Sequence, residues 1–165
     1  MDFEALIERS NERYDADGLA VVNKRPTPVH VTGKARGRVT GYFEKPSTVD
    51  FDGTLVGGRS VVFEAKQVKK ANRFDLDNIH DHQVEYLAKC HQLGGIAFVL
   101  IEIVMSQTVY MLPYPTFKSF WDNRNGGRRG CKSISVEALD VHAEIVEPGL
   151  VPVDWLPVVN KIWSL

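Results

Sequence analysis

The chain has 165 residues, 44% of them hydrophobic and 25% charged, the size and composition of one globular domain with a hydrophobic core. No apolar run approaches the ~18 residues of a transmembrane helix, and the acidic, amphipathic start MDFEALIERS is unlike a signal peptide. Cys90 and Cys131 lie far apart and form no CxxC motif, so we expect a reducing, cytoplasmic setting and no membrane partner.

The charged residues are unevenly distributed, although the net charge is only −1. Residues 24–45 carry six Lys or Arg against one Glu, and residues 118–132 carry five against one Asp. Residues 1–23 and 133–165 each have a net charge of −4. This pattern predicts a basic face suited to nucleic acid, with solvated basic loops as the alternative.

The first half of the chain reads as one helix followed by short strands. Apolar residues recur with a helical period over about 2–16, and Asp17-Gly18 ends this predicted helix. A strand at 19–22 follows, which the stiff segment KRPTP cannot continue centrally. GKARGR (33–38) is predicted as a mobile basic loop between two strands. Gly57-Gly58 predicts a hairpin turn between two β-rich runs.

The second half alternates helices with apolar strands. Its predicted elements are a helix at about 80–93, a central strand at 96–104, a strand at 108–112, a short helix after Pro115, a flexible basic loop at 123–132, and a last helix from about 153. The whole order predicts a single α/β domain over 1–165, with a mixed central β-sheet flanked by helices.

The stretch VVFEAKQVKK, which begins at Val61, starts as a buried strand and then becomes polar. Side chains alternate along a strand, so Phe63 and Ala65 belong to the apolar face and Glu64 and Lys66 to the other. The two charged groups lie roughly 7 Å apart along the strand, by the ~3.4 Å rise per residue. Their long side chains can therefore reach a common point.

Asp50, in PSTVDF, lies on the predicted partner strand of this hairpin. With Gly57-Gly58 as a two-residue turn, Asp50 faces Ala65 and its side chain points away from Glu64. One extra residue in the first strand would place Asp50 opposite Glu64. We therefore predict a β-bulge near Asp52-Gly53, where a glycine favours that irregularity.

Two carboxylates that converge with a lysine suit phosphodiester hydrolysis. Asp50, Glu64 and the Ala65 carbonyl would bind Mg²⁺, with Mn²⁺ as the alternative ion. Lys66 would orient the attacking water or stabilise the charge that develops on the phosphate. On spacing alone, a surface ion pair on an edge strand explains Glu64 and Lys66 at least as well. The basic segments on either side favour a nuclease.

Asp50, a thirteen-residue gap and then Glu64-Ala65-Lys66 match the PD-(D/E)XK nuclease pattern, which has a restriction-endonuclease-like fold. The strings SNERY, KRPTPVHV, GYFEKPSTVDFDG, VVFEAK, HDHQ, LGGIAFVLI and SFWD also occur in the order typical of one family. Over nearly its whole length the chain resembles the RecU family of bacterial Holliday junction resolvases.

The resemblance implies a Mg²⁺-dependent homodimer that nicks two strands symmetrically across a four-way DNA junction during recombination and repair. It assigns catalysis to Asp50, Glu64 and Lys66, with Asp50 and Glu64 as metal ligands. It also adds Glu4, on the first helix, and Gln83, in HDHQ, near the site as further catalytic residues. Contact with a RecA-type recombinase, and a bacterial or phage-infected cell, are further family expectations.

Three features depart from the family pattern. The family reads S-T-T-D where this chain has STVD, so any role of the second threonine is lost or falls to Thr48. The basic N-terminal extension is missing. The stalk that enters the junction centre is reduced here to a short basic segment at about 31–40.

The candidate DNA contacts are the basic side chains of these segments, namely Arg25, Lys34, Arg36, Arg38, Lys69, Lys70, Arg73, Arg124, Arg128 and Arg129. The spacing of His80, His82, Cys90 and His91 fits no standard zinc site. The three tryptophans are expected in packing rather than in base stacking. Two alternatives stay open: a PD-(D/E)XK nuclease for other branched or linear DNA, and a junction-binding protein that does not cut.

Overall fold

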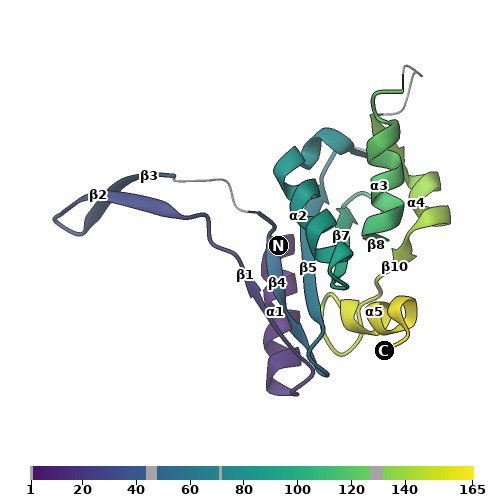
Figure 1. Ribbon diagram of the computed structural model, residues 1–165, viewed down its shortest axis with the longest axis horizontal. Coiled ribbons are helices and arrows are strands. Elements are labelled where there is room, and N and C mark those ends of the chain that lie inside the picture. The colour runs from purple at the N-terminus through teal and green to yellow at the C-terminus, as the bar shows by residue number, and fades with distance from the viewer. Residues whose placement is uncertain (1, 44–47, 71, 127–131) are drawn as a thin grey trace.

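A computed structural model describes residues 2–43, 48–70, 72–126 and 132–165 (Figure 1). A six-stranded sheet forms its centre, in the order β1-β4-β5-β7-β8-β10. These strands are β1 (Ala20–Lys24), β4 (Phe51–Leu55), β5 (Ser60–Val68), β7 (Ile96–Ile103), β8 (Thr108–Pro113) and β10 (Glu144–Ile145). β5 and β7 run parallel and the other neighbours antiparallel, which confirms the predicted α/β class with a mixed sheet.

Helices cover both faces of this sheet (Figure 1). The α-helices of the described residues are α1 (Phe3–Ala16), α2 (Asp81–Gln92), α3 (Tyr114–Asn123), α4 (Val136–His142) and α5 (Trp155–Trp163). One apolar core joins α1 and α5 to one face of the sheet, and a second joins α2, α3 and α4 to the other. No helix in the described ranges is long and apolar enough to cross a membrane.

The two faces of β5 carry different chemistry, as the alternation predicts. Val61, Phe63 and Ala65 belong to the core under α1 and α5, while Val62 belongs to the core under α2. Glu64 shares the face of Val62 because side chains two residues apart lie on the same side of a strand. The strand therefore presents its carboxylate toward α2.

A two-stranded hairpin projects from the body as a stalk, formed by β2 (Val29–Ala35) and β3 (Arg38–Phe43) (Figure 1). Every residue of both strands is exposed. The predicted loop at 33–38 is wrong, because Gly33, Lys34 and Ala35 pair with β3. Only Arg36 and Gly37 form the turn, both with positive φ, as a tight hairpin turn of the primed type requires.

The structure adds short elements that the sequence patterns did not predict. These are β6 (Arg73–Asp75), the 3₁₀ helix η1 (Leu76–Asn78), β9 (Ser133–Ser135), α4 and β10. Such short segments carry too few residues to show a period. Trp155 is fully buried, Trp121 nearly so, and Trp163 packs against the core, in agreement with the packing role expected for them.

The register of the β4–β5 hairpin corrects one prediction. Phe51 pairs with Phe63 and Thr54 with Ser60 without interruption, so no bulge occurs at Asp52-Gly53. The extra residue lies in the loop instead. Leu55 donates its N–H to the Arg59 carbonyl at 2.9 Å, which leaves a three-residue connection, 56–58. Its two glycines have φ of 90° and 87°, a conformation that other residues rarely adopt.

Gly53 has a different function from the predicted bulge. A Cβ atom there would lie 2.0 Å from the Val21 carbonyl oxygen and 2.6 Å from the Val22 Cα. The glycine therefore permits the close approach of β1 to β4. This contact brings the end of β1, and with it the base of the stalk, beside the residues around Asp50.

Candidate active site

The hairpin register places Asp50 beside Glu64, on the face covered by α2. The Asp50 main-chain N–H donates to Glu64 Oε2 at 3.2 Å. In return, the Ala65 main-chain N–H donates to Asp50 Oδ2 at 3.0 Å. These reciprocal bonds hold both carboxylates at one end of the hairpin.

Lys66 completes the predicted triplet. Its ammonium donates to Glu64 Oε1 and lies 3.6 Å from Asp50 Oδ2. The three predicted catalytic groups therefore meet at one point, and the cation lies between two carboxylates. This arrangement differs from a surface ion pair, because the Glu64 side chain is fully buried and only a quarter of Lys66 is exposed.

Gln83 also reaches this point, from the first turn of α2. Its Oε1 accepts a hydrogen bond from the His80 main-chain N–H at 2.9 Å, as in a helix capping box. This bond fixes the orientation of the amide, so Nε2 is the atom that faces Glu64. Nε2 donates to Glu64 Oε1 at 2.5 Å. The residue thus links the start of α2 to the buried carboxylate.

Burial sets the protonation chemistry of the site. It raises the pKa of Glu64 to about 8, Lys66 opposes this shift, and the negative charge of Asp50 adds to it. Burial by itself would lower the pKa of the Lys66 ammonium. The charges of Glu64 and Asp50 outweigh that effect, so the Lys66 pKa is raised. The lysine is therefore a cation at neutral pH.

Glu4 takes a different partner from the one expected. Its carboxylate forms an ion pair with Lys24 at 2.7 Å. It is near enough to Lys66 to contribute to the raised pKa of that ammonium. Glu4 thus lies at the margin of the site, in the first turn of α1.

The donor set at this point suits Mg²⁺. In the part of the chain that the structure describes, no cluster of three or more His, Cys, Asp or Glu side chains is arranged to hold a metal. Mg²⁺ does not require one, because it is commonly held by one or two carboxylates, with water and substrate phosphate as its other ligands. The carboxylates of Asp50 and Glu64 supply such oxygens. The Lys66 ammonium, placed between both carboxylates, marks where positive charge is favoured.

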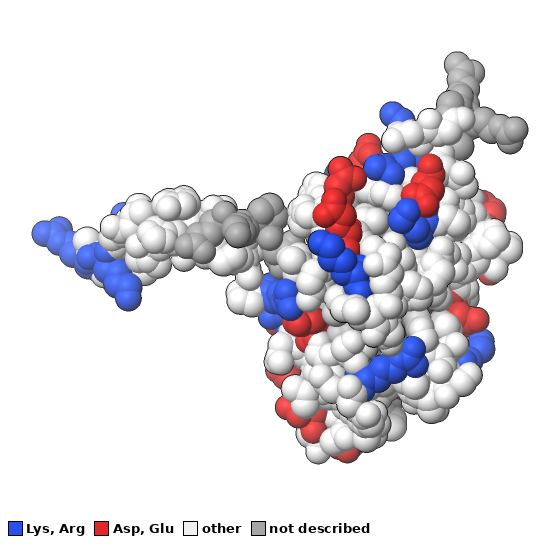
Figure 2. All heavy atoms as spheres, in the orientation of Figure 1, with Lys and Arg blue, Asp and Glu red and all other residues white. Residues whose placement is uncertain are grey.

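The predicted DNA contacts fall into four groups, of which the last has partners within the chain. Lys34, Arg36 and Arg38 lie exposed near the stalk tip, where basic side chains gather (Figure 2). Lys69 and Lys70 are exposed just beyond β5, three and four residues after Lys66. Arg128 and Arg129 lie outside the described residues.

The remaining basic candidates have partners within the chain. Arg73 pairs with Asp75 at 3.0 Å. Arg124 stacks over the Trp121 ring at 3.8 Å and approaches Asp81 at 3.3 Å. Arg25 is held by several groups around Asp50, including Thr48.

Two members of this last network, Asp52 and Tyr86, were not predicted from the sequence. Arg25 donates to the Asp52 carboxylate at 2.7 Å and to the Tyr86 hydroxyl at 3.0 Å. The one available signal was the spacing of Tyr86, three residues after Gln83 and so on the same helix face. The contact itself joins residues 61 positions apart in the chain, which no local pattern predicts.

Comparison with known proteins gives the family. The family model described as "RecU: Recombination protein U" matches residues 1–161. This chain belongs to the RecU family. A RecU relative from Staphylococcus saprophyticus, named Holliday junction resolvase RecU, is 39% identical over 145 residues, covering 84% of this chain and 68% of its own. One from Staphylococcus carnosus with the same name is 37% identical over 98% of this chain and 80% of its own.

A solved structure is also similar to this chain. The Holliday junction resolvase Hjc of Archaeoglobus fulgidus aligns with 84% of this chain and 92% of its own, at 11% identity and a TM-score of 0.47. The RecU resemblance expected from the sequence is thus confirmed by the family match. Of the residues that it assigned to the site, Asp50, Glu64, Lys66 and Gln83 meet directly, whereas Glu4 pairs with Lys24.

Proposed function

We propose that this chain is a Mg²⁺-dependent endonuclease that resolves four-way DNA junctions by paired, symmetric nicks during recombination and repair. The observation that carries the proposal is the meeting of Asp50, Glu64 and Lys66 on one face of the β4–β5 hairpin, in a RecU-family chain. Its relatives are named Holliday junction resolvases.

The residues of the site would have different roles in the reaction. Asp50 and Glu64, with the Ala65 carbonyl, would hold Mg²⁺, which when bound polarises a phosphoryl oxygen and lowers the pKa of its water. Gln83 keeps the Glu64 carboxylate in one orientation through its Nε2. Lys66 already lies beside both carboxylates, so its ammonium is placed to stabilise the charge that develops on the scissile phosphate.

Junction selectivity would come from the stalk and from a second copy of the chain. One catalytic centre cuts one strand, so two symmetric nicks require a homodimer. The exposed basic side chains at the stalk tip, Lys34, Arg36 and Arg38, would contact phosphates near the junction centre. Lys69, Lys70 and Arg73 would meet the backbone close to the cut, and Arg124, Arg128 and Arg129 would form a second patch.

The biological setting follows from this activity. A resolvase of this kind would act in the cytoplasm of a bacterial or phage-infected cell, where a RecA-type recombinase supplies the junctions. Mn²⁺ would support the same chemistry, since it also accepts carboxylate and water ligands.

One experiment tests the proposal. Labelled four-way junction and linear duplex of matched sequence are incubated with the protein, with Mg²⁺ and with EDTA. Symmetric nicks in the junction alone, only with Mg²⁺, are expected. Equal cutting of both substrates would indicate a general nuclease for branched or linear DNA. Binding to the junction without cutting in Mg²⁺ or Mn²⁺ would indicate a junction-binding protein and would overturn the proposal.

A further inference from the structure

Arg25 lies where β1 ends and the path to the stalk begins, and it contacts the chain on both sides of Asp50. Its main-chain N–H donates to the Asp50 carbonyl at 2.8 Å. Its guanidinium donates to the Thr48 hydroxyl through Nη1 at 2.7 Å and to Asp52 Oδ2 through Nη2 at 2.7 Å. One arginine therefore contacts Asp50 and the residues two positions before and two positions after it, Thr48 and Asp52.

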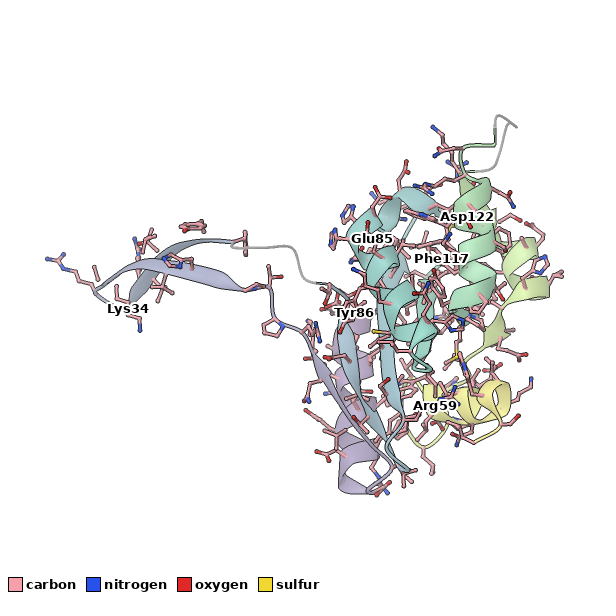
Figure 3. All side chains as sticks on the ribbon, viewed as in Figure 1. Lys34, Arg59, Glu85, Tyr86, Phe117 and Asp122 are labelled. Carbon is pink, nitrogen blue, oxygen red and sulfur yellow. The ribbon has the colours of Figure 1, made fainter. Side chains whose placement is uncertain are left out.

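The same guanidinium reaches the helix that carries Gln83. Nη2 donates to the Tyr86 hydroxyl at 3.0 Å, and the guanidinium lies 5.1 Å from the centre of the Tyr86 ring. Figure 3 shows Tyr86 on the side of α2 that faces the base of the stalk. Gln83 and Tyr86 are three residues apart and so share one face of α2. Arg25 thus connects the segment around Asp50 to α2, the helix whose Gln83 contacts Glu64.

These contacts use the particular geometry of arginine. A planar guanidinium can donate to Thr48, Asp52 and Tyr86 at once, whereas a lysine ammonium on a flexible stem cannot reproduce the fork. The Arg25 side chain is one-third exposed and its donors face groups within the chain. These internal partners compete with any phosphate for the same donors.

We propose that Arg25 is a positioning residue, which fixes Asp50 relative to Glu64 and joins the base of the stalk to the metal-binding carboxylates. This role rests on the proposed function, because it concerns the same site. It replaces a direct contact of Arg25 with DNA. Partners that orient metal ligands without touching the metal typically contribute 10- to 100-fold in metal affinity.

The test measures Mn²⁺ binding by calorimetry without DNA, for the wild type and for Arg25→Gln and Arg25→Lys. We expect Arg25→Gln to weaken Mn²⁺ binding about tenfold or more, with Arg25→Lys also weakened because it lacks the fork. Junction binding in EDTA should change little. Cleavage by Arg25→Gln should recover at high Mg²⁺, which loss of folded protein would not allow.

Arg13→Gln is the matched control, because Arg13 also pairs with one aspartate, Asp17, but at an exposed helix end far from the site. Melting temperatures check that each variant folds. If Arg25→Gln does not fold, Tyr86→Phe and Asp52→Asn each remove one partner of the guanidinium and should weaken Mn²⁺ binding by smaller factors.

Two outcomes would overturn the inference. Unchanged Mn²⁺ affinity with weakened junction binding, restored in Arg25→Lys, would make Arg25 a phosphate contact. Equal loss of metal binding in Arg13→Gln would show that the effect is not local. If the wild type binds Mn²⁺ but cuts no DNA, the proposed function fails while the positioning role is still measured by calorimetry.

Discussion

The main-chain N–H of Asp50 donates to the Glu64 carboxylate at 3.2 Å, so the backbone of one acidic residue orients the side chain of the other. Asp50 and Glu64 are fourteen positions apart, with Asp50 directly before β4 and Glu64 on the neighbouring strand β5. Glu64 is fully buried, and one of its oxygens is bonded to the backbone just before β4. A shift of β4 against β5 would therefore change where the Glu64 oxygens point. The site therefore depends on the register of this hairpin as much as on its residue types.

Asp50→Asn should abolish cleavage while junction binding persists. The amide keeps the size of the side chain and an oxygen to accept the Ala65 N–H, but it loses the charge that attracts a metal. We expect cleavage to fall about 100-fold or more, since metal catalysis contributes several kcal/mol and each 1.36 kcal/mol is tenfold. Single-turnover cleavage and a gel-shift titration in EDTA measure the two effects. Asp17→Asn, at an exposed helix end, is the control, and persistent cleavage by Asp50→Asn would mean that the metal site is wrongly assigned.

Glu64 should make the metal-free protein less stable as the pH rises. Its pKa of about 8 in the fold lies above its usual value of 4.5, so between these values the folded state holds a proton that the unfolded state has released. The stability contributed by this proton is complete below pH 4.5 and is lost by about pH 8, with a slope of at most about 1.4 kcal/mol per pH unit.

Glu64→Gln should remove this part of the pH dependence. Urea unfolding in EDTA at several pH values measures the difference between wild type and variant. That difference should grow from pH 5 to pH 8 in favour of the variant. Glu85→Gln, an exposed substitution on α2, is the matched control. A pH-independent difference between wild type and Glu64→Gln would contradict the raised pKa.

Gln83→Met should impair both the site and the start of α2. The thioether has a similar length but can neither donate to Glu64 nor accept from the His80 N–H. We expect about 1 kcal/mol or more of lost stability from the missing cap, and about tenfold lower cleavage from the misoriented carboxylate. Thermal melts and single-turnover cleavage measure these. Gln92→Met, at the exposed end of the same helix, should change neither the stability nor the cleavage rate. Equal effects of both substitutions would contradict this role of Gln83.

The stalk tip should control junction binding rather than the chemical step. Figure 3 shows Lys34 at the tip of the stalk. Lys34→Gln/Arg36→Gln removes two exposed positive charges from this tip. We expect the slope of log affinity against log salt to decrease by roughly 2, since each phosphate contact contributes about 0.9. Arg13→Gln/Lys161→Gln, which removes two charges from the body, should leave the slope unchanged. An unchanged slope in the stalk variant would show that its basic residues do not meet phosphates.

Gly53→Ala should destabilise the fold severely. A methyl group at this position would collide with the Val21 carbonyl, which belongs to backbone and cannot rotate away. Overpacking of this kind typically costs about 1–3 kcal/mol, occasionally more. Gly33→Ala is the control, because no atom lies within 4 Å of a Cβ there. Equal melting temperatures for the two variants would show that β1 does not press on Gly53.

Local sequence patterns are sufficient to predict the main secondary-structure elements and the chemistry of single strands. Helical and alternating patterns located the main helices and strands, and the alternation in VVFEAK separated its apolar face from its charged face. These features depend on residues close together in the chain, where periodicity and turn preference act directly. The family strings added Gln83 to the predicted catalytic residues.

Which groups meet depends on the packing of elements that are distant in the chain. A one-residue change in loop length reverses the face of every side chain in a hairpin, and both two- and three-residue loops can contain Gly57-Gly58. The structure has the three-residue loop, so Asp50 turns toward Glu64 without the predicted bulge. The contacts of Gly53 with β1, and of Arg25 with Tyr86, join strands and helices distant in sequence. They arise from packing, which no local pattern encodes.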